Sequence, residues 1–337
     1  MSLRAAIYGC AGTELGSAER SFFREARPWG FILFARNVAD PAQLRSLTAD
    51  LREAVGYDAP VLIDQEGGRV QRLRPPHWRA WPAGRRYGEL YARDAEKGLA
   101  AARLGAQLMA VELRDVGITV DCLPVLDVPV PGAHDVIGDR AYAETPDIVA
   151  ALGLAAAEGL LSGGVLPVVK HMPGHGRAGV DSHKSLPVVD TPRADLERID
   201  FAPFRALRQM PLGMTAHVVY TALDPGNPAT TSAAIIRDIV RGTIGFDGLL
   251  MSDDLSMQAL NGTLGERASA SLAAGCDLAL HCNGRMAEME EVAAEVPVLS
   301  GKPLARSKAA LARLTEPSAP VDTDSAYVKF SEWLATA

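Results

Sequence analysis

VLPVVKHMPGHG, residues 165–176, begins as an unbroken apolar run and ends in a segment rich in Gly, Pro and His. An unbroken run lacks the alternation of a strand with one wet face and is typical of a strand buried on both faces of a parallel sheet. Pro173, Gly174 and Gly176 then favour a loop. The stretch therefore predicts a buried strand whose end, at Lys170 and His171, opens directly into a loop.

Seven more runs along the chain have the same continuous character, and segments with helical apolar spacing separate them. Several of these segments begin at a capping residue, such as Asp40 before Pro41. Eight strand–helix repeats predict an α/β fold, a single TIM-type (β/α)8 barrel over residues 1–337, with C-terminal helices from about residue 300. The runs are AAIYG (5–9), GFILFARN (30–37), VLIDQE (61–66), ITVDCLPVLDV (118–128), VLPVVKH (165–171), LGMTAHV (212–218), LLMSDD (249–254) and DLALHC (277–282), and the helical segments are 41–55, 95–116, 145–161, 195–207, 232–241, 263–274, 303–314 and 325–333.

Two insertions interrupt the repeat. Residues 67–93 contain Trp78, Trp81 and several prolines, and residues 172–192 contain Gly, His and Pro. Long stretches without regular structure in a compact domain are usually functional loops. We therefore expect both insertions to be loops or lids.

Composition narrows the class of protein. The chain has 337 residues, 48% hydrophobic and 22% charged, with a net charge of −7. That balance argues against a nucleic acid or an anionic membrane as partner, since both favour a basic face. The chain has no apolar stretch of 18 residues, so no membrane span is predicted, and its first residues lack a signal-peptide core. We therefore expect a cytoplasmic protein. The short C-terminal extension gives no sign of a second domain, so we expect a monomer. Its four scattered cysteines indicate buried reduced thiols.

Polar residues recur at the ends of the predicted strands. In a (β/α)8 barrel, the carboxyl ends of the strands form one face, where catalytic groups lie. A single such residue often only caps the next helix, but adjacent ionisable pairs beside apolar strands are costly unless they are paired or used. The pattern predicts one polar pocket at one mouth of the barrel. The strand-end residues are Arg36, Asn37, Asp64, Glu66, Asp127, Lys170, His171, His217, Asp253, Asp254 and His281.

The loop after the fifth run carries the densest chemistry. Within DSHKSLP (181–187), Asp181 and His183 flank Ser182, so a local turn lets the carboxylate orient the imidazole. Such a pair acts as general acid and then general base near neutral pH. A metal site at His171 and His175 is the alternative, but Met-Pro-Gly between them prevents the helix that ligation at this spacing needs. We expect neither a metal nor a cofactor.

These segments together resemble the bacterial β-N-acetylglucosaminidases, or β-hexosaminidases, of glycoside hydrolase family 3, of the cell-wall recycling type. KHxPGHG followed by DSHxxLP is the most specific feature, and Met172 stands where the common form has Phe. The matching segments span most of the barrel in order: LFARN (33–37), IDQEGGRVQR (63–72), VIGDR (136–140), KHMPGHG (170–176), DSHKSLP (181–187), MTAHV (214–218) and MSDDLSM (251–257).

The resemblance implies a role for each matching position. Asp253 matches the nucleophile that forms a covalent glycosyl-enzyme, and His183 matches the general acid/base with Asp181 as its partner. The substrate implied is a small carbohydrate, N-acetylglucosaminyl-anhydro-muropeptide, from peptidoglycan recycling. The positions that match binders of the sugar's hydroxyl and N-acetyl groups are Asp64, Arg72, Arg140, Lys170 and His171.

Several alternatives stay open at this point. Phosphate could replace water as the acceptor, which would make the protein a β-N-acetylglucosaminide phosphorylase on the same residues. A metal-dependent hydrolase and a non-catalytic sugar-binding protein are the other two. Asp254 is expected to cap the next helix or support the site, and Glu66 to support a tight turn at Gly67-Gly68. Trp78 and Trp81 are expected to pack under their loop rather than stack on a sugar.

Overall fold

Eight parallel strands close into one barrel in the computed structural model, which describes residues 2–182, 184–315 and 322–336. Each of the eight apolar runs supplies one strand, so the predicted (β/α)8 barrel is confirmed. The ring closes where β1 pairs with both β2 and β12, through Ile7↔Gly30 and Ala6↔Ala279. In ring order the strands are β1 (Arg4–Gly9), β12 (Leu278–His281), β11 (Leu249–Asp254), β9 (Leu212–Thr215), β7 (Leu166–Met172), β6 (Val120–Asp121), β3 (Val61–Ile63) and β2 (Pro28–Leu33).

Both faces of these strands are buried, which explains why the runs do not alternate. In β1, Ala5 and Ile7 belong to a cluster inside the barrel, whereas Ala6 and Tyr8 pack outward under the helices. Trp29 fills part of the inner cluster and donates its indole N–H to Ser307 Oγ at 2.7 Å. The four cysteines are buried free thiols, as expected.

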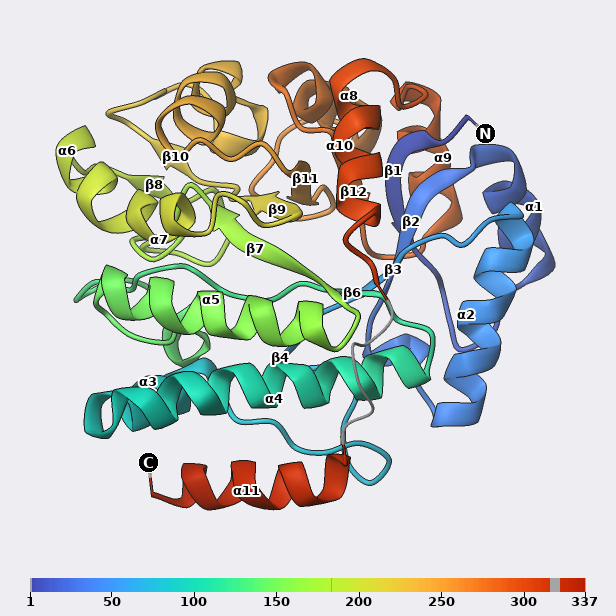
Figure 1. Ribbon diagram of the computed structural model, residues 1–337. Coiled ribbons are helices and arrows are strands. Elements are labelled where there is room, and N and C mark those ends of the chain that lie inside the picture. Colours follow the sequence, from blue (N-terminus) through green and yellow to red (C-terminus); the bar gives the residue numbers. More distant parts are fainter. Residues whose placement is uncertain (1, 183, 316–321, 337) are drawn as a thin grey trace.

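Helices surround the barrel (Figure 1). Asp40 caps α2 as expected, because its carboxylate accepts from two backbone N–H groups of the first turn. Two of the predicted helices contain wider π-helical turns, η3 (Leu196–Asp200) before α7 and η5 (Ile235–Thr243). The α-helices are α1 (Ser17–Ala26), α2 (Pro41–Val55), α3 (Gly84–Arg93), α4 (Ala95–Asp115), α5 (Pro146–Ser162), α6 (Arg193–Asp195), α7 (Phe201–Ala206), α8 (Leu264–Ala274), α9 (Met286–Glu295), α10 (Gly301–Leu311) and α11 (Thr323–Ala335).

The sequence interpretation was wrong in three places. It placed no helix at α1 or α9, and it treated residues 67–93 as irregular although their last ten residues form α3. Gly84 and Gly88 lower the helical propensity of α3, but both glycines allow close packing. A Cβ on Gly88 would lie 1.8 Å from the carbonyl oxygen of Tyr142. The rest of this insertion holds the short hairpin β4 (Gln65–Gly67) and β5 (Val70–Gln71).

The insertion at 172–192 is mostly irregular, as expected. Its end forms β8 (Val188–Val189), which pairs with β10 (Val219–Tyr220). Two residues of this insertion contact later parts of the chain. The carbonyl oxygen of Gly174 accepts from the Tyr220 hydroxyl, and Arg177 pairs with the buried Asp200 at 2.7 Å. These contacts attach the loop to the elements that follow it.

Helix α11 lies beside α4 on the outside of the barrel (Figure 1). Its Tyr327 and Phe330 make edge-on contacts with Trp81, whose indole N–H donates to Glu112 at 3.0 Å. The guanidinium of Arg79 forms ion pairs with the same Glu112 and with Asp324 of α11. The Trp81 side chain therefore packs against α11, in agreement with the expectation that it packs within the protein.

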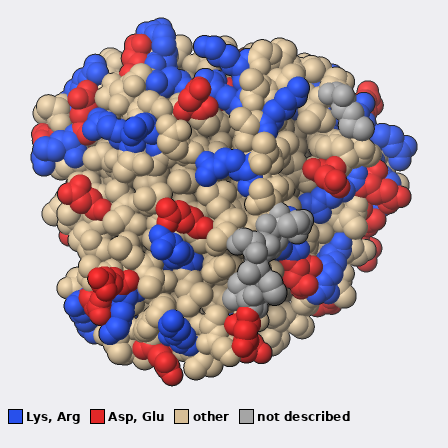
Figure 2. All heavy atoms as spheres, in the orientation of Figure 1, with Lys and Arg blue, Asp and Glu red and all other residues tan. Residues whose placement is uncertain are grey.

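The surface carries charges of both signs. On the face drawn in Figure 2, basic and acidic side chains are interspersed, so this face presents no extended field of one sign. None of the helices within the described ranges is long and apolar enough to cross a lipid bilayer.

Candidate active site

A cavity of about 300 Å³ opens at the carboxyl ends of the barrel strands. Polar residues from β3, β7 and β11 and from the segments after them converge there, while Ile32, Met214 and Leu280 form apolar parts of its wall. The strand-end pattern therefore predicted the right mouth of the barrel. The charged and polar lining residues are Asp64, Glu66, Arg72, Arg140, Lys170, His171, His175, Ser182, Asp253 and Asp254.

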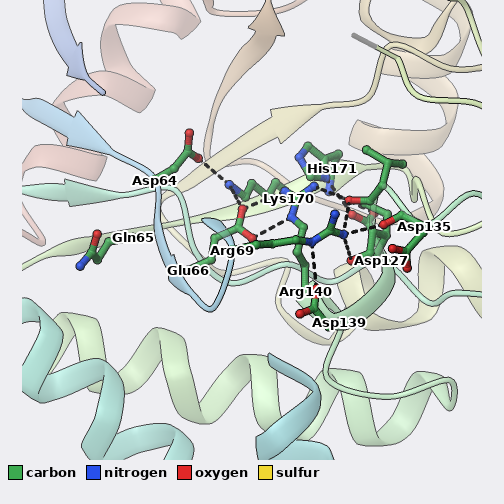
Figure 3. A network of polar contacts seen from close by, with 12 residues as sticks. Asp64, Gln65, Glu66, Arg69, Asp127, Asp135, Asp139, Arg140, Lys170 and His171 are labelled. Carbon is green, nitrogen blue, oxygen red and sulfur yellow. Dashed lines mark hydrogen bonds and ion pairs between the residues drawn. The ribbon is translucent and has the colours of Figure 1, made fainter. Parts of the chain in front are cut away.

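Five of these residues form a row of alternating charges. Arg72 Nη2 lies 3.0 Å from Asp64 Oδ2, and Lys170 Nζ lies 2.7 Å from Asp64 Oδ1. Lys170 Nζ also lies 2.6 Å from Glu66 Oε1, and Arg140 donates one hydrogen bond to each carboxylate oxygen of Glu66, both at 2.8 Å. Figure 3 shows Lys170 between the two carboxylates. Three cations against two carboxylates leave this row with one positive charge in excess.

The row fixes the ionisation of its members. Burial alone would raise the pKa of Asp64, but Lys170 and Arg72 hold it well below its usual range. Burial likewise opposes the charge on Glu66, yet Arg140 and Lys170 lower its pKa. Burial disfavours the ammonium of Lys170, and the two carboxylates outweigh it and raise the pKa of that group. All of these groups are therefore charged at neutral pH.

A second polar group lies deeper, around Asp127. Its carboxylate contacts His171 Nδ1 at 2.7 Å and accepts from the backbone N–H groups of His171 and His175 at 3.2 and 2.6 Å. Burial opposes the charge on Asp127, but His171 lowers its pKa to about 2. With Nδ1 bound to Asp127, His171 can present Nε2 to the cavity. Asp127 thus sets the orientation of an imidazole that the resemblance assigns to sugar binding.

His175 links this group to the loop of Asp181. Its Nε2 lies 3.1 Å from the hydroxyl of the buried Ser182, and its Nδ1 is buried with no hydrogen-bond partner among the described residues. Burial, and then the charge of His171, lower the pKa of His175 to about 4, so the ring is neutral at pH 7. The contact holds Ser182, and with it the neighbouring Asp181, against the barrel.

Asp253 and Asp254 end β11 and differ in their surroundings. Asp254 accepts from the backbone N–H groups of Ser256 and Cys282 at 3.0 and 3.1 Å and from the Ser256 hydroxyl at 2.6 Å. Thr263, not Asp254, caps α8, so Asp254 supports the turn after β11. The Asp253 carboxylate accepts from the backbone N–H of Asp254 at 2.8 Å and lines the cavity.

Six of the eight predicted site residues meet at this cavity. They are Asp64, Arg72, Arg140, Lys170, His171 and Asp253. Asp181 is not part of the lining, although its neighbour Ser182 is, and His183 lies outside the described residues. Sequence reasoning named Glu66 and Asp127 only as strand-end residues, and it considered His175 only as a ligand in the alternative of a metal site. Their signals, a carboxylate before Gly-Gly and a second His in KHMPGHG, were present but ambiguous.

Other strand-end residues serve the structure. Arg36 donates to the carbonyl oxygens of Cys10 and Cys282, and Asn37 binds the carbonyl oxygens of Cys10 and Gly12. His217 contacts Thr230 Oγ1 at 2.7 Å and the carbonyl oxygen of Asp254 at 3.0 Å. In the described part of the chain, no group of three or more His, Cys, Asp or Glu side chains is placed to hold a metal ion.

The cavity suits a neutral polyhydroxylated ligand beside a carboxylate. Lys170 uses two of its three N–H donors on Asp64 and Glu66, which leaves one for a ligand hydroxyl. Each carboxylate retains lone pairs for further hydroxyl donors. The excess positive charge of the row favours an ionised Asp253.

Comparisons with known proteins agree with this geometry. The sequence profile of the glycosyl hydrolase family 3 N-terminal domain matches residues 17–316. The beta-hexosaminidase of Thioalkalivibrio sulfidiphilus is 41% identical over 321 residues, which cover 93% of this chain and 89% of that protein. The beta-hexosaminidase of Bordetella avium is 40% identical over 277 residues, 81% of this chain and 79% of that one. NagZ from Neisseria gonorrhoeae, solved in complex with N-trifluoroacetyl-D-glucosamine, matches with a TM-score of 0.86 at 32% identity, over 100% of this chain and 97% of that chain.

The free energy of unfolding should decrease as the pH is lowered, because the fold holds His175 in its neutral form. An unfolded imidazole titrates near pH 6.5, so between about pH 6.5 and 4 the unfolded chain binds a proton that folded His175 does not. Folding stability is therefore full above this window and decreases through it, by about 2–4 kcal/mol from this group. We expect His175→Gln to flatten the pH dependence of the unfolding free energy, measured by urea denaturation between pH 7.5 and 4.5.

The matched control is His77→Gln, because His77 is an exposed imidazole. That variant should keep the slope of the unmodified protein. Equal slopes for His175→Gln and the unmodified protein would show that His175 is not held neutral.

Proposed function

This chain belongs to glycosyl hydrolase family 3, and we propose that it is a retaining exo-β-N-acetylglucosaminidase with Asp253 as its nucleophile. The observation that carries the proposal is the position of Asp253 at the end of β11, in the same cavity as the row of alternating charges. A glycoside hydrolase of this type needs an ionised carboxylate on one side of the anomeric carbon and a proton donor on the other.

The proposed reaction has two steps. The Asp253 carboxylate attacks the anomeric carbon, the glycosidic C–O bond breaks, and the leaving oxygen takes a proton from the acid. Water then attacks the same carbon, loses a proton to that group and releases Asp253. Two inversions restore the β configuration.

The proposed acid/base is the pair Asp181 and His183 on the loop after β7. Ser182 between them is buried against His175, which supports a position of this loop beside the cavity. An imidazole that titrates near neutral pH can donate its proton to the leaving oxygen in the first step and accept one from water in the second.

The proposed sugar contacts follow from the unused donors and acceptors of the row. Asp64, Arg72 and Lys170 suit the ring hydroxyls, since charged groups make the stronger hydrogen bonds to them. Arg140 of the row and the neighbouring His171 also line the cavity and are further proposed contacts of the sugar's hydroxyl and N-acetyl groups. A cavity of about 300 Å³ lies at the small end of the range for ligand pockets, which favours one terminal sugar and therefore exo action.

The proposed natural substrate is an N-acetylglucosaminyl-anhydro-muropeptide of peptidoglycan recycling, cleaved in the cytoplasm by a monomer. The support is the resemblance of the motifs and the similarity to beta-hexosaminidases and NagZ. The named relatives are hexosaminidases, so the phosphorylase alternative has no support from them.

Product analysis tests the substrate. We expect the purified protein to release free N-acetylglucosamine from a mixture of anhydro-muropeptides, with the same yield with and without phosphate and in excess EDTA. Mass spectrometry identifies the products. A sugar 1-phosphate that appears only with phosphate would establish phosphorolysis instead, and inactivity after EDTA treatment would point to a metal.

Asp253→Ala tests the nucleophile. We expect turnover of an aryl β-N-acetylglucosaminide to fall by roughly 10³-fold or more, because the covalent step is lost. Added azide should restore part of the reaction and give the α-glycosyl azide, since a small anion can attack from the vacated side. Circular dichroism verifies folding, and proton NMR of the unmodified protein's first product should show the β anomer. Normal turnover by the variant would remove Asp253 from the mechanism.

His183→Ala tests the acid. An activated aryl leaving group needs little protonation, whereas a sugar leaving group needs it fully. The variant should therefore lose roughly 10²-fold or more on the muropeptide and much less on a dinitrophenyl glycoside in the glycosylation step. Equal losses on the two substrates, measured under single-turnover conditions, would contradict an acid role.

A further inference from the structure

Residues 135–140 form one wall of the cavity, and little regular structure supports them. Val136, Ile137 and Arg140 line the cavity, while Asp135 and Asp139 are exposed. The segment contains only the short 3-10 turn η2 (Gly138–Arg140). Ile137 packs against Val125 and Ala141, and polar contacts to this wall come from Glu66 and Arg69 of the hairpin that follows β3.

The inner contact is made by Glu66. Its carboxylate receives Nε and Nη2 of Arg140, each at 2.8 Å, and its side chain is only 3% exposed. Arg140 Nη1 donates to the carbonyl oxygen of Val136 at 3.1 Å. Three of the five guanidinium N–H groups are thus used within the protein, which leaves two for a ligand. A bidentate pair of this kind fixes the plane of the guanidinium as well as its position.

The outer contact is made by Arg69. Its Nη2 donates to three consecutive carbonyl oxygens, of Asp135, Val136 and Ile137, at 2.5, 3.0 and 3.1 Å, and its Nε lies 2.9 Å from Asp139 Oδ1. Figure 3 shows Arg69 directed at this turn. One side chain therefore closes the turn that precedes Arg140.

The backbone on both sides is shaped for these contacts. Gly138 has a φ of +46°, and a Cβ there would lie 2.2 Å from Asp135 Oδ1 and 3.2 Å from Arg69 Nη2. Gly67 and Gly68, with φ of +93° and +57°, make the hairpin turn between Glu66 and Arg69. From α3, Gly84 packs against the backbone, since a Cβ would lie 2.3 Å from the carbonyl oxygen of Arg140.

We propose that Glu66 and Arg69 are positioning residues that act together as a clamp on residues 135–140 and so set Arg140 for the ligand. The turn at Gly67-Gly68 sends Glu66 to the buried side of the segment and Arg69 to its exposed side. The inference rests on the proposed function for its effect on turnover, while the clamp itself is a property of the fold.

Arg69→Ala tests the clamp without entering the cavity. We expect kcat/KM for an aryl β-N-acetylglucosaminide to fall roughly ten- to a hundredfold, since a small displacement of a binding group has effects of that size. The loss should lie mainly in KM, because Arg140 binds and does not react. Arg69→Lys keeps the charge but not the planar fork, so it should resemble Arg69→Ala more than the unmodified protein.

The control is Arg85→Ala. Arg85 is a half-buried arginine of α3 that pairs with Glu144 at 3.2 Å, beyond the clamped segment and away from the cavity lining. Its removal deletes a similar charge and a similar ion pair, so kcat/KM should stay within about twofold of the unmodified protein.

Two further measurements separate positioning from general stability. In hydrogen–deuterium exchange, amides in 133–141 should exchange faster in Arg69→Ala than in Arg85→Ala. In an Arg140→Ala background, Arg69→Ala should cause little additional loss of kcat/KM, because it acts through Arg140. Unchanged exchange in that segment, or equal losses in both backgrounds, would overturn the proposal. If the unmodified protein does not hydrolyse the glycoside, the proposed function fails, and the exchange comparison still decides on the clamp.

Discussion

A buried ammonium between two carboxylates is the interaction on which the site depends. Lys170 is 2% exposed, and a charge at that depth is stable only with partners at hydrogen-bond distance. Asp64 follows β3, Glu66 lies in the hairpin after it, and Lys170 lies near the end of β7, so the pairing requires β3 and β7 to lie on either side of β6. Assembly of these three strands and formation of the row of charges are therefore coupled, and each stabilises the other.

The small net charge of the row is compatible with the proposed ligand, an uncharged sugar beside the Asp253 carboxylate. Every charge within the row has an opposite neighbour, which leaves Asp253 to face a modest excess of positive charge rather than a strong one. A strong excess would favour anionic ligands and would weaken Asp253 in its proposed role as the nucleophile. The balance comes from Glu66, which offsets one of the two cations it contacts.

The sequence alone predicted the barrel because strands buried on both faces produce continuous apolar runs. It predicted where Asp64, Lys170 and Asp253 converge, because strand ends share one mouth. It could not predict the role of Glu66, since the partner Arg140 lies 74 residues away and a carboxylate before Gly-Gly also suits a turn. It missed α3 because glycines that permit close packing at Gly84 and Gly88 resemble loop residues in sequence.

The aromatic contact between α11 and Trp81 has a consequence for how the molecule is made. Arg79 and Asp324 are 245 positions apart, yet their contact helps cover the insertion at residues 67–93. During synthesis, the Trp81 side chain therefore gains its aromatic partners on α11 only when the last part of the chain is made. A nascent chain that ends before α11 would leave this side of Trp81 in contact with water, so the last helix completes the apolar cover of a segment made much earlier.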